Sequence, residues 1–275
     1  MNRPGIAEPL LMPGPGSPWS RVRQSMAWHG HVVVQANWRD WLPAAFTDPE
    51  LRPLLGARDW RRLRTLRDPE ARDRFAASRL LVKYTAGAAL QAAPDTVELA
   101  YKAGGRPYLR GCDQIEVSLS HTGDLLVVGL NRRGRIGVDT ERADRRIQYS
   151  AIHRHLCTPD ERRRLAGLPQ AEQQHRLLRT WTLKEAYTKA LGQGMRMGFT
   201  QFGFDADATS LLTPQGAPAS HGEWTFATFV LDGGYLVAVA CHDAGLDQEG
   251  DTAVGTMLDE GFLGEVVDLV SRAER

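Results

Sequence analysis

Apolar residues recur with helical spacing in two long stretches, and each stretch is followed by short apolar runs typical of strands. In the first stretch, Phe75, Leu80, Leu81, Tyr84 and Ala88 are spaced as on one helical face, with Pro69 near the start. We therefore predict long helices over 69–91 and about 171–191, with shorter helical segments near 58–66, 148–155 and 159–166. Strands are predicted at 31–36, 97–101, 115–119, 125–131, 135–138, 199–204, 224–231 and 235–241.

The same order of a long helix and then strands occurs twice, which indicates a weak internal duplication of architecture. We place the N-terminal half at 28–137 and the C-terminal half at 138–242. The Pro- and Gly-rich residues 1–27 are expected to form a flexible arm, because they are too interrupted to build a packed element. Residues 243–275 are expected to form a tail, in which 255–272 has the apolar spacing of an amphipathic helix.

Composition narrows the class of protein. The chain has 275 residues and a formal net charge of +1, which argues against nucleic acid as a bulk partner. Its three cysteines are scattered, which fits a reducing cytoplasm better than a disulfide framework or a zinc site. The N-terminus has no apolar core of a signal peptide, and no membrane span is predicted.

Acidic residues occur at spacings that favour a metal site. Asp139 and Glu141 lie two apart at the end of a predicted strand, so both carboxylates point to one face. Glu185 and Lys189 lie four apart in the second long helix and also share a face, together with Trp181. Three converging acids and a lysine would suit a divalent cation and a phosphate. Taken singly, the same acids also fit ordinary loop or helix positions.

Other candidate residues have simpler interpretations beside the functional ones. Ser120 and His121 follow a strand and could offer donors to a phosphate, or form an ordinary hairpin turn. Arg106 follows two glycines and could face an anion. Thr158, Pro159 and Glu161 have the spacing of a helix capping box. The only lysines are Lys83, Lys102, Lys184 and Lys189.

Four motifs in this order resemble one enzyme family. They are Gly105-Arg106-Pro107, SLSHTG at 118–123, GVDTE at 137–141 and WTLKEAYTKALGQG at 181–194. Together they resemble the 4′-phosphopantetheinyl transferases of the larger, surfactin-synthetase-activating type, over about 60–241. The resemblance implies an α/β (α+β) fold of two pseudo-symmetric halves. Each half would be a long helix on a small, mostly antiparallel sheet, with the active site in the cleft between the halves.

The resemblance also implies roles for individual residues. Asp139, Glu141 and Glu185 would be ligands of Mg²⁺, which Mn²⁺ could replace. Coenzyme A would be bound by Lys189, Ser120, His121 and Arg106, with Arg62 near its 3′-phosphate. Glu161 would be the catalytic base beside Lys189, or else only the third residue of a capping box.

The implied reaction transfers 4′-phosphopantetheine from coenzyme A to a serine of an apo acyl or peptidyl carrier protein and releases 3′,5′-ADP. A metal-dependent pyrophosphate hydrolase and a non-catalytic coenzyme A-binding module remain as alternatives. We expect a monomer, since one chain holds both halves. The sequence does not identify the carrier as one of fatty-acid, polyketide or peptide synthesis.

Overall fold

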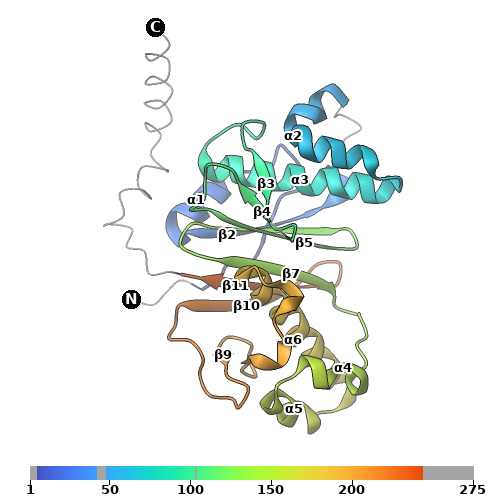
Figure 1. Cartoon of the computed structure of the whole chain (residues 1–275), viewed down its shortest axis with the longest axis vertical. Coiled ribbons are helices and arrows are strands. Elements are labelled where there is room, and N and C mark those ends of the chain that lie inside the picture. The colour runs from blue at the N-terminus through green and yellow to red at the C-terminus, as the bar shows by residue number, and fades with distance from the viewer. Residues whose placement is uncertain (1–4, 42–47, 103, 244–275) are drawn as a thin grey trace.

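The chain forms four layers, with two small sheets face to face in the middle and helices on both outer sides (Figure 1). The computed structural model describes residues 5–41, 48–102 and 104–243. Its helices in these ranges are α1 (Ser20–His29), α2 (Asp48–Thr65), α3 (Pro69–Leu90), α4 (Tyr149–Leu156), α5 (Pro159–Ala166) and α6 (Gln170–Leu191), with the 3₁₀ segments η1 (Trp38–Trp41), η2 (Gly194–Arg196) and η3 (Phe199–Gln201). Its strands are β1 (Leu10–Leu11), β2 (His31–Asn37), β3 (Leu99–Tyr101), β4 (Pro107–Leu109), β5 (Glu116–Thr122), β6 (Leu125–Asn131), β7 (Ile136–Arg142), β8 (Gly203–Phe204), β9 (Leu211–Leu212), β10 (Trp224–Leu231) and β11 (Tyr235–His242).

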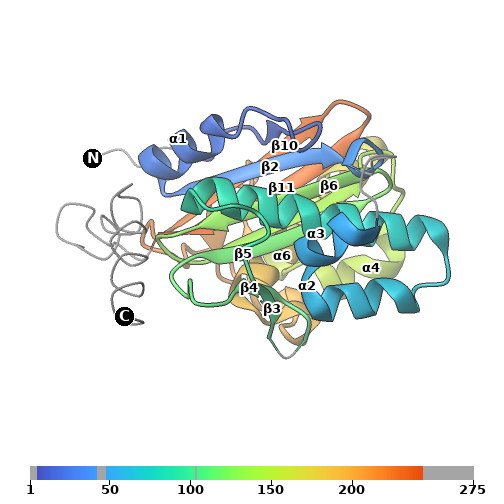
Figure 2. The same cartoon turned by 90° about the horizontal axis from the view of Figure 1, so that it is seen from above.

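The first sheet has the order β1-β2-β6-β5, and all its neighbours are antiparallel except β1 and β2. Alternate residues of β2, such as Val32 and Val34, point outward into a core that they share with Leu80 and Leu81 of α3. Helices α1, α2 and α3 cover this half, as the view from above shows (Figure 2). The outer side chains of the first sheet thus anchor the first long helix.

The second sheet is antiparallel, with the order β10-β11-β7. Its outer face packs on α6, where Ala238 and Ala240 of β11 meet Ala186 and Ala190. Helices α4 and α5 lie on the far side of this half (Figure 1). Each half is therefore a long helix on a small sheet, as the sequence predicts.

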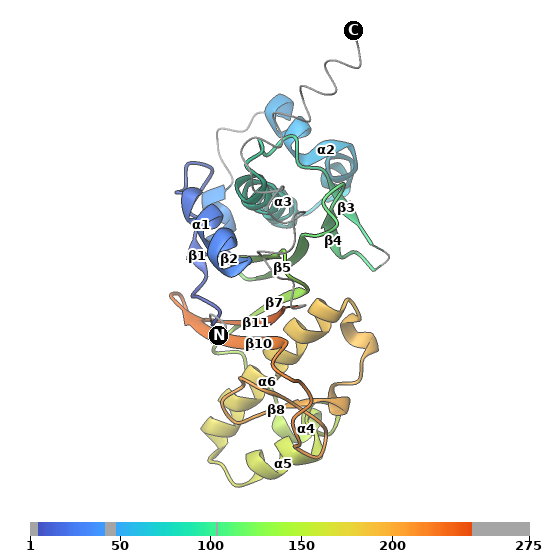
Figure 3. The same cartoon turned by 90° about the vertical axis from the view of Figure 1, so that its left-hand side faces the viewer.

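The inner faces of the two sheets share one core (Figure 3). Val33 and Val127 from the first sheet pack with Val138, Val237 and Val239 from the second. Strand β6 is buried along its whole length, which explains its uninterrupted apolar sequence. Strands β5 and β7 lie next to each other where the two halves meet, and this line of contact is called the seam below. The shared core holds the two strands in place relative to each other.

A glycine on β7 lets α6 approach the sheet closely. A Cβ atom at Gly137 would lie 1.8 Å from the carbonyl oxygen of Ala186, so only glycine fits there. Gly192, with φ +70°, ends α6 in the left-handed region. The close approach brings the polar side chains of α6 to the level of β7.

The long helices over 69–91 and 171–191 and most predicted strands are confirmed. Strands β5 and β7 extend further than expected, to Thr122 and Arg142, so Ser120, His121, Asp139 and Glu141 all lie within strands. The predicted strand 199–204 is instead a 3₁₀ turn, η3, followed by the two-residue β8. The expected boundary after residue 137 falls inside β7.

Residues 5–27 are folded, so the prediction of a flexible arm over 1–27 is wrong for the described part. Met12, Val22 and Met26 are completely buried, and β1 pairs with β2. The Trp41 indole donates to the carbonyl oxygen of Met12 at 2.7 Å. The N-terminal segment is folded in spite of its prolines and glycines, because buried apolar side chains and the hydrogen bond from the Trp41 indole stabilise it. The predicted tail over 243–275 lies, from residue 244 onward, outside the part of the chain that the structure describes.

No helix in the described ranges has the length and apolar character needed to cross a lipid bilayer.

Candidate active site

Three predicted site residues meet where the two halves join. The carboxylate oxygen Oδ1 of Asp139 accepts hydrogen bonds from Ser120 Oγ at 2.9 Å and from Lys189 Nζ at 2.6 Å. Lys189 Nζ also donates to Ser120 Oγ at 3.0 Å. Ser120 comes from β5, Asp139 from β7 and Lys189 from α6, so the contact requires both halves.

The alternation of β7 explains why Asp139 faces α6. Gly137, Asp139 and Glu141 lie on one face of the strand, and Gly137 is in contact with α6. Ile136 and Val138 point the other way, into the core between the sheets. The sequence prediction that both carboxylates share a face is therefore confirmed.

Two further carboxylates lie close enough to Asp139 to affect each other's ionisation. Burial raises the pKa of Glu185, and the negative charges of Asp139 and Glu141 raise it further. Burial also raises the pKa of Glu141, although the nearby Arg145 acts in the opposite direction. Glu141 forms an ion pair with Arg145.

Among the residues that the structure describes, no three His, Cys, Asp or Glu side chains are arranged so that they could hold a metal ion as they stand. At present, the cationic partners of these acids are Lys189, for Asp139, and Arg145, for Glu141. Two of the three predicted metal ligands, Asp139 and Glu141, are therefore each engaged by a protein cation.

A cluster of positive charges lies beside the acids. His121 is exposed on β5, and its pKa is lowered by partial desolvation and by the positive charges of Arg74, Lys189 and Arg79. Arg74 and Arg79 belong to α3, so the cations come from both long helices. Such a concentration of positive charge suits a ligand with several phosphate groups.

Two predicted coenzyme A contacts lie apart from this cluster. The guanidinium of Arg106 donates to Glu116 Oε2 at 2.6 Å and to the carbonyl oxygens of Ala190 and Ile136 at 3.0 and 3.3 Å. Arg62 is exposed on α2, and no contact joins it to the cluster within the described residues. The structure thus gives Arg106 protein partners and leaves Arg62 at the periphery.

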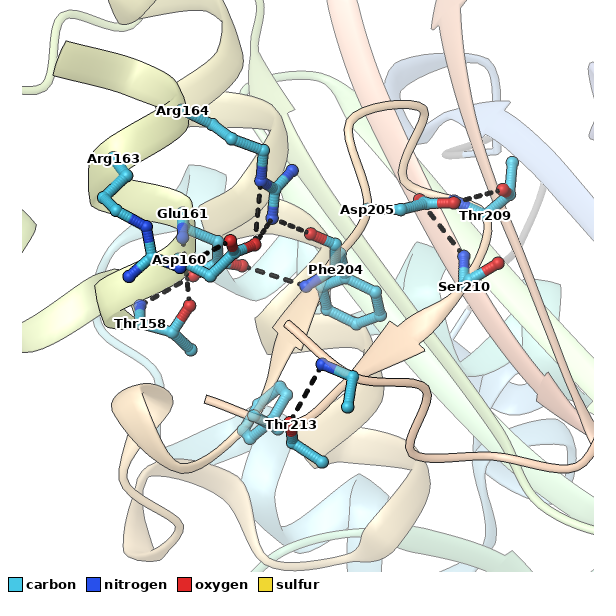
Figure 4. A network of polar contacts seen from close by, with 12 residues as sticks. Thr158, Asp160, Glu161, Arg163, Arg164, Phe204, Asp205, Thr209, Ser210 and Thr213 are labelled. Atoms are coloured by element: carbon cyan, nitrogen blue, oxygen red, sulfur yellow. Dashed lines mark hydrogen bonds and ion pairs between the residues drawn. The ribbon is translucent and has the colours of Figure 1, made fainter. Parts of the chain in front are cut away.

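Glu161 lies in a buried network with Thr158 and Phe204 (Figure 4). The predicted capping box is confirmed: Thr158 N donates to Glu161 Oε2 at 2.8 Å, and Glu161 N donates to Thr158 Oγ1 at 3.1 Å. Phe204 N donates to the other carboxylate oxygen at 3.0 Å. With both oxygens occupied and an exposed fraction of 4%, Glu161 is not placed to take a proton from a partner protein.

The partner that sequence reasoning missed is Lys184. Its Nζ donates to Glu161 Oε2 at 2.7 Å and to the carbonyl oxygens of Leu156, Phe199 and Phe202, and the residue is completely buried. The scarcity of lysine was the available signal, since Lys184 is one of four in an arginine-rich chain. It did not reveal that Lys184 would be internal.

Comparisons with known proteins point to one family. A sequence model of the 4′-phosphopantetheinyl transferase superfamily matches residues 135–240, which include Asp139, Glu141, Glu185 and Lys189. The chain is 30% identical over 175 residues to the 4′-phosphopantetheinyl transferase HetI of Nostoc sp., covering 62% of this chain and 72% of that protein. It is also 30% identical over 232 residues to a phosphopantetheinyl transferase of Thraustochytrium sp., with 78% of each chain covered.

A third relative, the 4′-phosphopantetheinyl transferase psf-1 of Bacillus pumilus, is 30% identical over 142 residues, covering 50% of this chain and 58% of that protein. The family match, the two long alignments and the two-halved fold agree with one another. The chain belongs to the 4′-phosphopantetheinyl transferase superfamily.

Proposed function

We propose that the protein transfers the 4′-phosphopantetheine group of coenzyme A to a serine hydroxyl of an apo acyl or peptidyl carrier protein and releases 3′,5′-ADP. The observation that carries this proposal is the Ser120–Asp139–Lys189 contact, which joins both halves beside two further acids. Nothing in the comparisons favours a hydrolase or a non-catalytic binding module.

Coenzyme A would bind through its phosphates. Lys189, Arg74 and Arg79 supply the positive charge, the imidazole of His121 can donate a hydrogen bond, and Ser120 Oγ supplies a hydroxyl at the same place. The exposed Arg62 on α2 would interact with the outlying 3′-phosphate. Held in this way, the pyrophosphate is oriented for in-line attack by the carrier serine, and positioning supplies much of the acceleration.

The donor set fits a divalent cation of the Mg²⁺ or Mn²⁺ type. Asp139, Glu141 and Glu185 are oxygen donors. Burial raises the pKa of the two glutamates, repulsion among the carboxylates adds to it, and a cation would relieve that repulsion. These three residues would hold the ion, with Lys189 and Arg145 giving way to it. When bound, the ion would supply positive charge to the pyrophosphate as charge develops on the leaving ADP.

The proton of the carrier serine would pass to water at the half-open seam as its hydroxyl attacks. We assign Glu161 a structural role and not that of the base, because its oxygens are engaged by Lys184, Thr158 and Phe204. Lys189 remains next to the phosphate oxygens on which charge develops.

We further propose that the protein acts as a monomer in the cytoplasm. Both halves of the site belong to one chain, and the three cysteines are free thiols. Sedimentation of the active protein at assay concentration would measure the oligomeric state directly.

The experiment that tests the function uses purified full-length protein, coenzyme A, Mg²⁺ and a panel of apo-carriers from fatty-acid, polyketide and peptide synthesis. Mass spectrometry should find one phosphopantetheine added to at least one carrier, and none when its acceptor serine is alanine. Release of 3′,5′-ADP without a carrier would indicate a hydrolase and contradict the proposal. The preferred carrier would identify the pathway.

A further inference from the structure

We propose that Arg106 is a positioning residue that holds the end of α6 against β5, and thereby sets the place of Lys189, instead of binding coenzyme A. This inference rests on the proposed function, because its effect is measured on transfer.

The partners of Arg106 belong to three elements that meet at the seam. Glu116 is on β5 of the first half, whereas Ile136 begins β7 and Ala190 lies near the end of α6 in the second. The side chain of Arg106 is 18% exposed and that of Glu116 is 24% exposed. A guanidinium is suited to this arrangement, because its rigid fork can donate to several acceptors at once.

A tight backbone turn fixes the point from which the side chain of Arg106 extends. Gly104 and Gly105 have φ values of +97° and +87°, which a side chain would strain, and Pro107 follows directly. The amide of Lys102 donates to the carbonyl oxygen of Arg106 at 2.9 Å. The tight turn therefore delivers the guanidinium to the seam.

The acceptor on α6 is the carbonyl oxygen of Ala190, which has no donor within the helix. Ala190 is in the last turn of the helix, where carbonyl oxygens lack intrahelical donors and a positive charge is favourable. Arg106 Nη1 satisfies this oxygen at 3.0 Å. The contact holds the backbone directly after Lys189.

Two parallel links thus join β5 to α6. Glu116 connects through Arg106 to Ala190, and Ser120 connects to Lys189 at 3.0 Å. Glu116 and Ser120 are four residues apart on one strand, about 13 Å. Under this proposal the first link binds no substrate, although the sequence predicted Arg106 as a coenzyme A contact, and it restricts the second link, whose Lys189 faces the phosphates.

An alternative role for Arg106 as a phosphate ligand makes the opposite prediction about Glu116. If Arg106 binds coenzyme A, removing the carboxylate of Glu116 frees the arginine and leaves or strengthens binding of an anion. If Arg106 is a positioning residue, losing Glu116 has the same consequence as losing Arg106.

The test is a double-mutant cycle with Arg106→Ala, Glu116→Ala and both changes together, measured as kcat for transfer and as coenzyme A Kd by calorimetry. We expect each single variant to lower kcat about tenfold or more, the double variant to be no worse than either, and Kd to change less than about threefold. Lys102→Ala is the matched control. It removes an exposed contact to the same carboxylate, 3.4 Å away, and should leave kcat within about twofold of the wild type.

Full kcat in Glu116→Ala with weakened coenzyme A binding in Arg106→Ala would overturn the proposal, as would additive losses. If Arg106→Ala does not fold, Glu116→Gln decides: a lower kcat at unchanged Kd supports the positioning role, and an unchanged kcat overturns it.

A second measurement keeps this inference separate from the proposed function. Amide exchange at Gly192 and Gln193, which donate to the carbonyl oxygens of Lys189 and Thr188, should rise equally in both single variants. Unchanged exchange would overturn the positioning role. A wild-type protein that modifies no carrier would overturn the proposed function alone.

Discussion

Helix α6 carries two lysines five residues apart, and each binds an acid, yet the two pairs differ in nearly every other respect. Lys184 Nζ lies 2.7 Å from Glu161, and Lys189 Nζ lies 2.6 Å from Asp139. The side chains of the first pair are 0% and 4% exposed, and those of the second are 31% and 10% exposed. The same chemistry therefore occurs once in an interior and once at a half-open seam.

The difference lies in what else each lysine can bind. Lys184 donates to Glu161 and to three backbone carbonyl oxygens from two segments, at Leu156 and at Phe199 and Phe202. Among the described residues, Lys189 donates to two acceptors, Ser120 and Asp139, at the place where further acids and cations gather. A buried pair with a full set of partners connects elements, whereas a partly exposed pair with few partners can exchange them for substrate.

The largest effect is expected at the exposed pair. Asp139→Ala should lower transfer by about 10³-fold or more, because it removes a proposed metal ligand and the partner of Lys189. The protein should remain folded, since Asp139 lies at the seam. Single-turnover rates with saturating coenzyme A and Mg²⁺, beside circular dichroism, measure both. Normal transfer would eliminate the metal assignment.

The buried pair should respond in the opposite way. Lys184→Met is expected to lower the free energy of unfolding by about 3–5 kcal/mol, because Glu161 would keep a buried charge without its partner. Lys189→Met is the matched control and should cost less than about 1 kcal/mol, since that pair is partly exposed, while transfer is lost. Urea unfolding of both variants measures the contrast. Equal losses of stability would refute the distinction.

A buried group without an acid as close partner sharpens the comparison. Burial, helped by His29, lowers the pKa of His31 from 6.5 to about 4. Below about pH 6.5 the unfolded chain binds a proton on this histidine, but the folded chain does not until about pH 4. Stability should therefore be complete above pH 6.5 and fall by about 3 kcal/mol as the pH drops to 4.

Urea unfolding across this range, with His31→Gln as the variant and the exposed His155→Gln as control, isolates the contribution of His31. The slope between pH 4 and 6.5 should shrink only in the His31 variant. An undiminished slope in that variant would assign the pH dependence to other groups.

The smallest effect on transfer is expected for Glu161→Gln. The amide keeps the shape of the side chain but weakens its bond to Lys184, so the unfolding free energy should fall by about 1–3 kcal/mol. Transfer by the folded protein should stay within about threefold of the wild type. A fall in kcat of about 10²-fold at normal stability would restore Glu161 as the base.

The motifs predicted the fold class and named residues that meet at the seam, such as Asp139 and Lys189, but not the partners of each residue. Asp139 and Lys189 were found because strand and helix periods are local properties. The role of Lys184 depended on carbonyl oxygens from two other segments, and that of Arg106 on Glu116 and Ala190. Such contacts are set by tertiary packing, which local spacing does not encode. The folded N-terminal segment escaped prediction for the same reason, since its core partners are β2 and Trp41.

The order of strands in the second sheet has a consequence for how the protein becomes active during synthesis. Strand β11 lies between β10 and β7, and it is the last described strand to leave the ribosome. Until it arrives, β7 has no partner within its own sheet, so the sheet that carries Asp139 is incomplete. A nascent chain therefore carries every proposed catalytic residue long before it can react, and competence should appear abruptly once Tyr235–His242 is available.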